Sequence, residues 1–280
     1  MEQNWKKIIE PKNRLLDLKL REVIHYRDLI FMFVKRNFKS QYKQTILGPL
    51  WFIINPLITS VLFTVVFGGI AKISTDGVPQ FLFYMAGNTA WSYFASCLTS
   101  TSSTFTANAG VFGKVYFPRL VMPISTVIFS ALSFLIQLLM MIGFMIYFIV
   151  IGENVQPNMY IWLLPVFTLH LAIMGLGFGI IISSLTTKYR DLSVLVGFGV
   201  QLWLYITPIV YPVSTLSAKA KSLVMLNPVA PIVCNFRYAF LGCGQMEWGY
   251  WGISAIVTVI VLFIGLIIFN RVEKTFMDTV

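Results

Sequence analysis

Residues 120–151 read LVMPISTVIFSALSFLIQLLMMIGFMIYFIVI, a run without a single charged side chain. An α-helix rises about 1.5 Å per residue, so about 20 apolar residues cross a hydrocarbon core of roughly 30 Å. This run is longer than one crossing needs, and its ends are expected to tilt, break or project beyond the lipid. The stretch predicts a membrane-spanning helix and sets the fold class.

Five further apolar segments of bilayer length lie on either side of this run, at 50–70, 81–103, 161–186, 192–211 and 251–270. The whole chain of 280 residues is 57% hydrophobic and only 11% charged, whereas soluble domains carry about 25% charged residues. A soluble domain is therefore excluded. The sequence predicts an all-α membrane protein with six transmembrane helices.

The basic residues assign the two sides of the membrane. Of 21 Lys and Arg residues, 17 lie in the segments that six spans would place on the same side as both termini, and 11 of these precede residue 50. By the positive-inside bias, both termini are predicted to be cytoplasmic. The net charge of +10 therefore indicates membrane orientation, not nucleic-acid binding.

The first 49 residues contain no uninterrupted apolar core of a signal peptide and are expected to remain. They form a predicted cytoplasmic segment (1–49), followed by a transmembrane domain (50–270) and a cytoplasmic tail (271–280). Apolar residues at helical spacing over residues 26–42, with basic residues between them, predict an amphipathic interface helix after a first short helix. Its surface is expected to anchor on lipid, to dock a cytoplasmic partner, or to do both on different faces.

The predicted spans hold very few ionisable groups. None of the 11 acidic residues lies inside a span, which disfavours a proton- or sodium-coupled carrier, because such carriers rely on intramembrane carboxylates. His170 is expected to make hydrogen bonds between packed helices, in the company of the neutral side chains Asn55, Asn88, Gln137 and Gln201.

Small residues and loops add three expectations. Gly175, Gly177 and Gly179 predict close helix contact within one span. The connection 212–249 is interrupted by prolines and predicts either two re-entrant half-helices or a surface loop packed on the outer ends of the spans. Cys234 and Cys243 lie in this outward connection, where they are expected either to form a bridge or to remain buried thiols, and Cys97 is expected to pack within a span.

Catalytic motifs are not evident in the sequence. The run Gly110-Val-Phe-Gly-Lys114 has the wrong spacing for a phosphate-binding loop. Two histidines and three scattered cysteines cannot assemble a metal site. An enzyme acting on lipid-linked sugars stays as an alternative, supported only by the lone Asp191 beside Arg190.

Several short motifs of the chain, taken together, resemble those of a known protein family. They are KRNFKSQYK (35–43), LGPLW (47–51), NPL (55–57), KVYFPR (114–119) with Pro123, YRDL (189–192), PIVYP (208–212), LNP (226–228) and FR (236–237). As a set, the sequence resembles the ABC-2 type permeases that export lipid-linked polysaccharides such as O-antigen, capsule and teichoic acid. The resemblance covers nearly the whole chain.

This resemblance implies a half-transporter of a bacterial inner membrane. Two copies form a twelve-helix channel for a polyprenyl-pyrophosphate-linked glycan, and two copies of a separate ABC subunit bind ATP and Mg, so this chain holds no cofactor of its own. Export of a drug or small lipid by the same fold is the alternative. The implied elements that couple to the ATP-binding subunit are 27–42 and 108–119, with the residues Arg27, Asp28, Lys35, Arg36, Lys39, Lys114 and Arg119.

The resemblance also implies a cytoplasmic gate. Its residues, together with basic side chains that meet the lipid pyrophosphate, are Lys43, Leu47, Gly48 and Arg190. Arg and Lys suit phosphate by charge, and Arg also by its bidentate geometry. Aromatic faces let sugar rings slide along a channel, and the candidate channel aromatics are Tyr84, Trp91, Tyr93, Phe94 and Tyr205. The alternative for each of these rings is contact with lipid or packing between helices.

Overall fold

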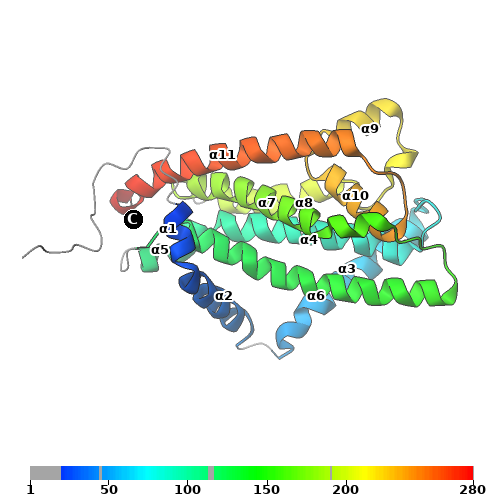
Figure 1. The fold of residues 1–280 in the computed structure, drawn as a ribbon, viewed down its shortest axis with the longest axis horizontal. Helices are drawn as coiled ribbons and strands as arrows, with labels where there is room; N and C mark the ends of the chain where they lie inside the picture. The colour runs from blue at the N-terminus through cyan, green and yellow to red at the C-terminus, as the bar shows by residue number, and fades with distance from the viewer. Residues whose placement is uncertain (1–19, 44–45, 113–116, 190, 280) are drawn as a thin grey trace, which may run out of the picture.

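The computed structural model describes residues 20–43, 46–112, 117–189 and 191–279, and within them all regular structure is helical. Four long helices run side by side along the long axis of the molecule (Figure 1). They are α4 (Gln80–Ser102), α6 (Val121–Ile151), α7 (Leu164–Thr186) and α11 (Trp248–Thr279). The predicted all-α membrane class is confirmed.

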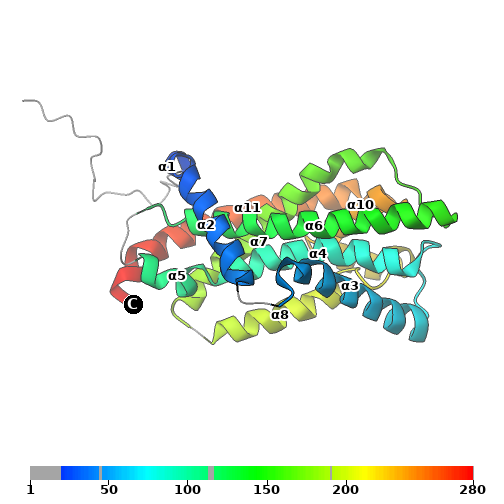
Figure 2. The same cartoon turned by 90° about the horizontal axis from the view of Figure 1, so that it is seen from below.

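The shorter helices lie at the two ends and along one side of this bundle. At one end, near the last turns of α11, are α1 (Leu20–His25), α2 (Arg27–Tyr42) and α5 (Thr104–Phe112), and at the other are α9 (Ala218–Met225) and α10 (Ala230–Leu241) (Figure 1). Figure 2 shows α3 (Trp51–Phe63) and α8 (Leu192–Ile206) along one side. Short 3-10 helices span Gly48–Leu50, Met159–Leu163 and Val213–Thr215, and a π-helical stretch, Thr64–Ile70, continues α3.

Helix α7 packs between α4 and α11 through glycines. A Cβ atom built on Gly175 or Gly179 would lie 2.6 Å from Cys97 Cβ or 2.5 Å from Thr101 Cβ, both on α4. On the other face, a Cβ on Gly177 would lie 3.1 Å from the backbone of Leu262 on α11. Without a hydrophobic driving force between helices in lipid, such close backbone approach supplies the packing energy. The predicted close helix contact at these glycines is confirmed.

A hydrogen-bonded group also joins α7 to α11. The indole Nε1 of Trp251 donates to His170 Nδ1 (2.9 Å), so the proton on the imidazole lies on Nε2, which is 2.9 Å from Thr258 Oγ1. Thr258 in turn donates to the Ser254 carbonyl oxygen and is free to accept from the ring. His170 therefore acts as the predicted link between packed helices.

Four helical segments are long and apolar enough to cross a membrane: Gly48–Ile70, Val121–Ile151, Met159–Thr186 and Trp248–Val272. The bent pair α9 and α10 would make a fifth if it were one broken span. The other two predicted spans correspond to α4, whose polar residues lower its hydropathy, and to α8, which has only 15 residues. Every predicted span contains helix, but the count of six stays a prediction.

The connection between α8 and α11 forms two helices, as expected for residues 212–249. Helices α9 and α10 meet at an angle of 103° around Asn227 and Pro228. Helix α10 is buried along most of its length against α4, α7 and α11, whereas in α9 only Met225 is buried. Burial of α10 in protein is compatible with both predicted alternatives, a pair of re-entrant half-helices or a loop packed on the ends of the spans. Re-entry into the membrane stays a prediction.

We expect the variant Gly179→Val to be destabilised, because the new side chain would collide with Thr101. Overpacking of this kind typically costs about 1–3 kcal/mol. The matched control is Gly143→Val on α6, where nothing lies within 4 Å of an added Cβ. Thermal unfolding of the purified proteins in detergent measures the difference, and equal stability of the two variants would contradict the packing role of the α7 glycines.

Candidate functional site

A polar groove lies between α3, α4 and α6, within the helical bundle. Each helix contributes polar side chains spaced four residues apart: Asn55 and Thr59 on α3, Asn88, Ser92 and Ser96 on α4, and Ser133 and Gln137 on α6. Residues at i and i+4 share one helix face, so three polar stripes meet. The groove encloses about 270 Å³ and holds no ionisable side chain among its lining residues.

Internal hydrogen bonds satisfy only some of the polar side-chain atoms in the groove. Ser92 Oγ donates to Asn88 Oδ1 (3.4 Å), and Ser96 Oγ lies 2.8 Å from Ser130 Oγ. The side-chain oxygen of Gln137 is buried and has no partner in the described part of the chain. Buried polar atoms are normally hydrogen-bonded, so this groove offers unused acceptor and donor capacity to a polar substrate or to water.

Sequence reasoning found only part of this groove. Asn55, Asn88 and Gln137 stand out from the sequence as polar residues within spans, but Thr59, Ser92, Ser96 and Ser133 do not, because hydroxyls are common in membrane helices. The signal that would have found them is the repeated four-residue spacing on three different segments. Gln201, the fourth polar residue, lies exposed on α8.

The predicted channel aromatics do not line this groove. Tyr84, Trp91, Tyr93 and Phe94 are buried in the core of the chain, where Tyr93 stacks on Phe134 and Trp91 contacts Trp203. Tyr205 on α8 is 54% exposed. The channel role of these rings stays a prediction, which the position of Tyr205 suits better than that of the other four.

The basic end of the bundle brings the two predicted coupling elements together. Arg36 on α2 donates from Nη2 to Asn108 Oδ1 on α5 (3.2 Å), and its guanidinium lies 4.7 Å from the centroid of the Phe33 ring. The Arg119 guanidinium lies 5.5 Å from the Phe112 ring of α5. Segments about 70 residues apart in sequence thus form one surface.

The apolar face of α2 packs on the chain itself. Ile30, Phe33 and Val34 are buried in a cluster with Phe105, Phe117 and residues at the start of α6, so this face is not free to lie on lipid. Phe31 and Met32 on the same helix are exposed and keep contact with lipid possible. Lys35 and Lys39 of α2 are exposed, as a docking surface requires.

Most of the other residues predicted for partner coupling and for the gate lie in the described part of this basic end. Lys35, Lys39 and Lys43 are exposed, and Arg27 and Asp28 form an exposed ion pair of 3.9 Å. Leu47 is exposed, and Gly48 has a φ of +50°, which favours glycine at this turn. Lys114 and Arg190 lie outside the described residues.

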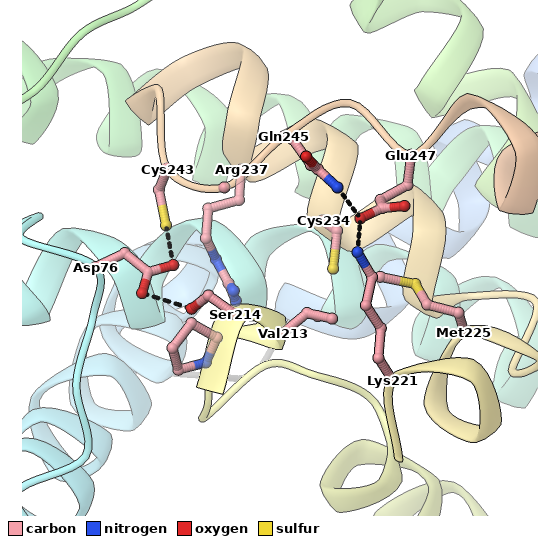
Figure 3. A pocket seen from close by; sticks show the side chains of 12 residues that line it. Asp76, Val213, Ser214, Lys221, Met225, Cys234, Arg237, Cys243, Gln245 and Glu247 are labelled. Atoms are coloured by element: carbon pink, nitrogen blue, oxygen red, sulfur yellow. Dashed lines mark hydrogen bonds and ion pairs between the residues drawn. The ribbon is translucent and has the colours of Figure 1, made fainter. Parts of the chain in front are cut away.

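The opposite end contains a polar cavity of about 340 Å³ (Figure 3). Cys234 and Cys243 both line it, and both are free thiols in the structure, as is the buried Cys97 on α4. Burial raises the pKa of the Cys243 thiol to about 11, with a smaller contribution from Asp76, to which the thiol donates. Of the two alternatives for this pair, the structure has the unbridged one.

No group of three or more His, Cys, Asp or Glu side chains able to hold a metal ion occurs in the described ranges. The site consists instead of a neutral polar groove inside a helical membrane bundle, with a basic surface at one end and, at the other, the polar cavity that Cys234 and Cys243 line, called the outer cavity below. This arrangement is that of a multi-pass transport permease.

The chain belongs to the ABC-2 type transporter family, whose sequence pattern matches residues 28–241. The resemblance stated from the short motifs is therefore confirmed. The chain is a transport subunit, not an enzyme, and membership implies pairing with an ABC ATP-binding subunit.

Individual relatives match the sequence of this chain over almost their full length. The chain is 30% identical over 266 residues to an O-antigen export system permease protein RfbA of Klebsiella pneumoniae, covering 94% of this chain and 99% of the relative. It is 27% identical to RfbA of Myxococcus xanthus over 93% of this chain and 98% of that protein. It is also 24% identical to the polysialic acid transport protein KpsM of Escherichia coli, over 87% and 93% of the two chains.

The raised pKa of Cys243 predicts a distinctive pH dependence of alkylation. The thiolate is the reactive form, so below a pKa of about 11 the alkylation rate should rise about tenfold per pH unit and keep rising above pH 9. The measurement uses a small thiol reagent on a chain in which Cys97 and Cys234 are replaced by alanine.

The matched control for this measurement is Gln245→Cys in a cysteine-free chain, on the exposed part of the same loop. An exposed thiol has a pKa of about 8.5, so the control rate should level off near pH 9. If Cys243 levels off at the same pH, its thiol is not buried as the structure has it.

Proposed function

We propose that the chain is the transmembrane subunit of an ATP-driven ABC exporter that moves a lipid-linked polysaccharide, similar to O-antigen, outward across a bacterial inner membrane. The observation that carries this proposal is the groove of neutral hydroxyl and amide side chains between α3, α4 and α6. Relatives named as O-antigen export permeases support the same substrate class.

The chemistry of the groove suits a glycan. Hydroxyl and amide side chains can form hydrogen bonds with sugar hydroxyls, because each of these groups carries both a donor and an acceptor. The absence of a fixed charge among the lining residues keeps any one sugar from being held tightly, which favours sliding of a long polymer. No carboxylate lies in the groove to couple transport to protons.

The energy source in this proposal is a separate subunit. Two copies of an ABC ATP-binding protein, carrying ATP and Mg, dock on the end formed by α1, α2 and α5. The exposed basic residues of α2 and the Arg36–Asn108 contact support this end as the docking surface. Because 17 of 21 basic residues lie in the segments that six spans would put on this side, we place it and both termini in the cytoplasm.

A second copy of the chain completes the channel in this proposal, and each copy contributes six spans. Helix α8 has no buried residue, and the polar groove opens beside α3 at Asn55 and Trp51, which are exposed. An open polar groove facing lipid would leave polar groups unsatisfied at high cost. Covering the side that carries α3 and α8 (Figure 2) with the same side of a second copy removes that cost.

The polyprenyl pyrophosphate of the substrate is proposed to enter at the cytoplasmic gate. Lys43 precedes the turn at Leu47 and Gly48 by four residues in the sequence, and Arg190 is expected to add a second basic group. A pyrophosphate carries several negative charges, which Lys and Arg bind by charge and hydrogen bonding.

Export of a drug or small lipid is the second candidate. An almost wholly apolar cavity of about 500 Å³ between α8, α4 and α7 favours it, because such a cavity accepts an acyl chain but few sugar hydroxyls. Deletion of the gene separates the two candidates. Accumulation of a lipid-linked glycan in the cytoplasm supports polysaccharide export, and its absence supports the second candidate.

We expect charge reversal on the docking surface to weaken assembly. The double variant Lys35→Glu and Lys39→Glu places two negative charges on the exposed face of α2, and recovery of the ATP-binding subunit by co-purification should fall about tenfold or more. The control is Lys72→Glu, an exposed lysine at the opposite end. Undiminished co-purification of the double variant would refute this docking surface.

We also expect a bulky side chain in the groove to block export. Ser92→Trp and Ser96→Trp fill the space between α3, α4 and α6, so glycan export should drop to near background while the ATP-binding subunit still co-purifies. Ile260→Trp, on the exposed face of α11, is the matched control. Normal export by both groove variants would show that the substrate takes another path.

A further inference from the structure

The outer cavity is assembled from five elements of the chain. Its polar side chains come from the connection before α4, from the 3-10 helix Val213–Thr215, from α9 and α10, and from the loop that follows α10. They are Asp76, Ser214, Lys221, Arg237, Gln245 and Glu247. Figure 3 shows the Arg237 guanidinium between Asp76 on one side and the Lys221–Glu247 pair on the other.

Arg237 is a buried charge without an ion-pair partner. It is only 3% exposed, and its guanidinium lies 3.7 Å from the centroid of the Phe83 ring on α4. Its Nη2 donates to the carbonyl oxygens of Pro208 and Ile209, both at 3.0 Å. No carboxylate of the described residues lies within ion-pair distance, and its Nε has no hydrogen-bond partner there.

The fold makes room for this guanidinium. A Cβ on Gly87 of α4 would lie 2.5 Å from Arg237 Nη2, so a larger residue there would displace the guanidinium. Burying a charge is costly unless hydrogen bonds and opposite charge compensate. The two carbonyls and the aromatic ring compensate in part, while Arg237 itself lines the cavity and its Nε stays buried without a partner in the described residues.

Two carboxylates line the same cavity as Arg237. Asp76 accepts hydrogen bonds from Ser214 Oγ (2.6 Å) and from the Cys243 thiol (3.7 Å). Glu247 accepts from Lys221 and from Gln245 Nε2 (3.2 Å). A carboxylate has about four lone-pair sites, so both acids retain acceptor capacity.

The charge balance of the cavity selects the ligand. Two cations and two carboxylates give the lining residues no net formal charge. An anion would meet Asp76 and Glu247, a cation would meet Arg237 and Lys221, and an apolar group would leave the polar side chains of the wall without hydrogen-bond partners in the ligand. A polyhydroxylated molecule both donates and accepts at each hydroxyl, and so matches all walls at once.

We propose that this outer cavity binds a neutral sugar residue, as a subsite for the glycan leaving the permease. Its volume of about 340 Å³ lies at the lower end of the range of about 300–1,000 Å³ for ligand pockets, which suits a ring or two, not a long chain. The assignment of the sugar to an exported glycan rests on the proposed function, whereas the binding itself rests on the cavity.

The test is saturation-transfer NMR on the full chain in lipid nanodiscs without glycoside detergents, which would compete. The probes are the methyl glycosides of glucose, mannose, galactose and rhamnose, with inorganic phosphate as the anionic competitor. At least one glycoside should bind, and Asp76→Asn and Gln245→Ala should each weaken it about tenfold, the loss expected for a removed hydrogen bond to a charged or polar group. Phosphate should not displace it.

Lys72→Ala, on the same connection as Asp76 but not lining the cavity, is the control and should bind like the parent chain. Protection of Cys243 from alkylation by the bound glycoside gives a second readout at the site itself. No glycoside binding, binding unaffected by both cavity variants, or displacement by phosphate would each overturn the proposal.

Failure of this proposal and failure of the proposed function are distinguishable. If gene deletion accumulates a lipid-linked glycan but no glycoside binds the cavity, the sugar subsite is wrong and polysaccharide export stands. If a glycoside binds with the expected variant pattern but no glycan accumulates, the cavity is a sugar site and its assignment to an exported glycan is wrong.

Discussion

The close approach of α7 to α4 on one face and to α11 on the other is the contact on which the rest of the structure depends. Gly175 and Gly179 admit α4, and Gly177 admits α11. Apolar helix surfaces gain no hydrophobic free energy when they leave lipid and pack on one another. Helix association in the membrane therefore requires close backbone packing and hydrogen bonds. The His170 link between Trp251 and Thr258 supplies the hydrogen bonds in the same seam.

This packing decides where polar groups lie. With one side of α4 fixed against α7, the stripe Asn88, Ser92 and Ser96 turns toward α3 and α6, where it meets the stripes of those helices. The same residues make α4 too polar to qualify as a span by hydropathy, although it is the most buried of the long helices. The polarity of α4 and its central position belong together, because a membrane tolerates a polar helix where protein surrounds it.

Charge is distributed along the molecule in three zones. The end formed by α1, α2 and α5 is basic and exposed, the groove is neutral and polar, and the cavity at the other end holds the Lys221–Glu247 ion pair together with Arg237 and Asp76. A polymer that enters by a charged lipid group, slides through a neutral path and leaves past a weak sugar site would meet these zones in that order. Under the proposed function, the charged zones would bind the substrate and the neutral groove would let it slide.

The sequence by itself determined the helical class, the amphipathic character of α2, the close packing at the α7 glycines and the lack of acids within spans, because each is written in local composition or in the 3.6-residue period of a single helix. Only the tertiary structure decided that Thr59, Ser92 and Ser133 converge, that Tyr84, Trp91, Tyr93 and Phe94 turn inward, and that Arg237 shares a cavity with Asp76. A helical period shows which residues share a face, but the neighbour of that face depends on packing between segments far apart in the chain, which no local pattern encodes.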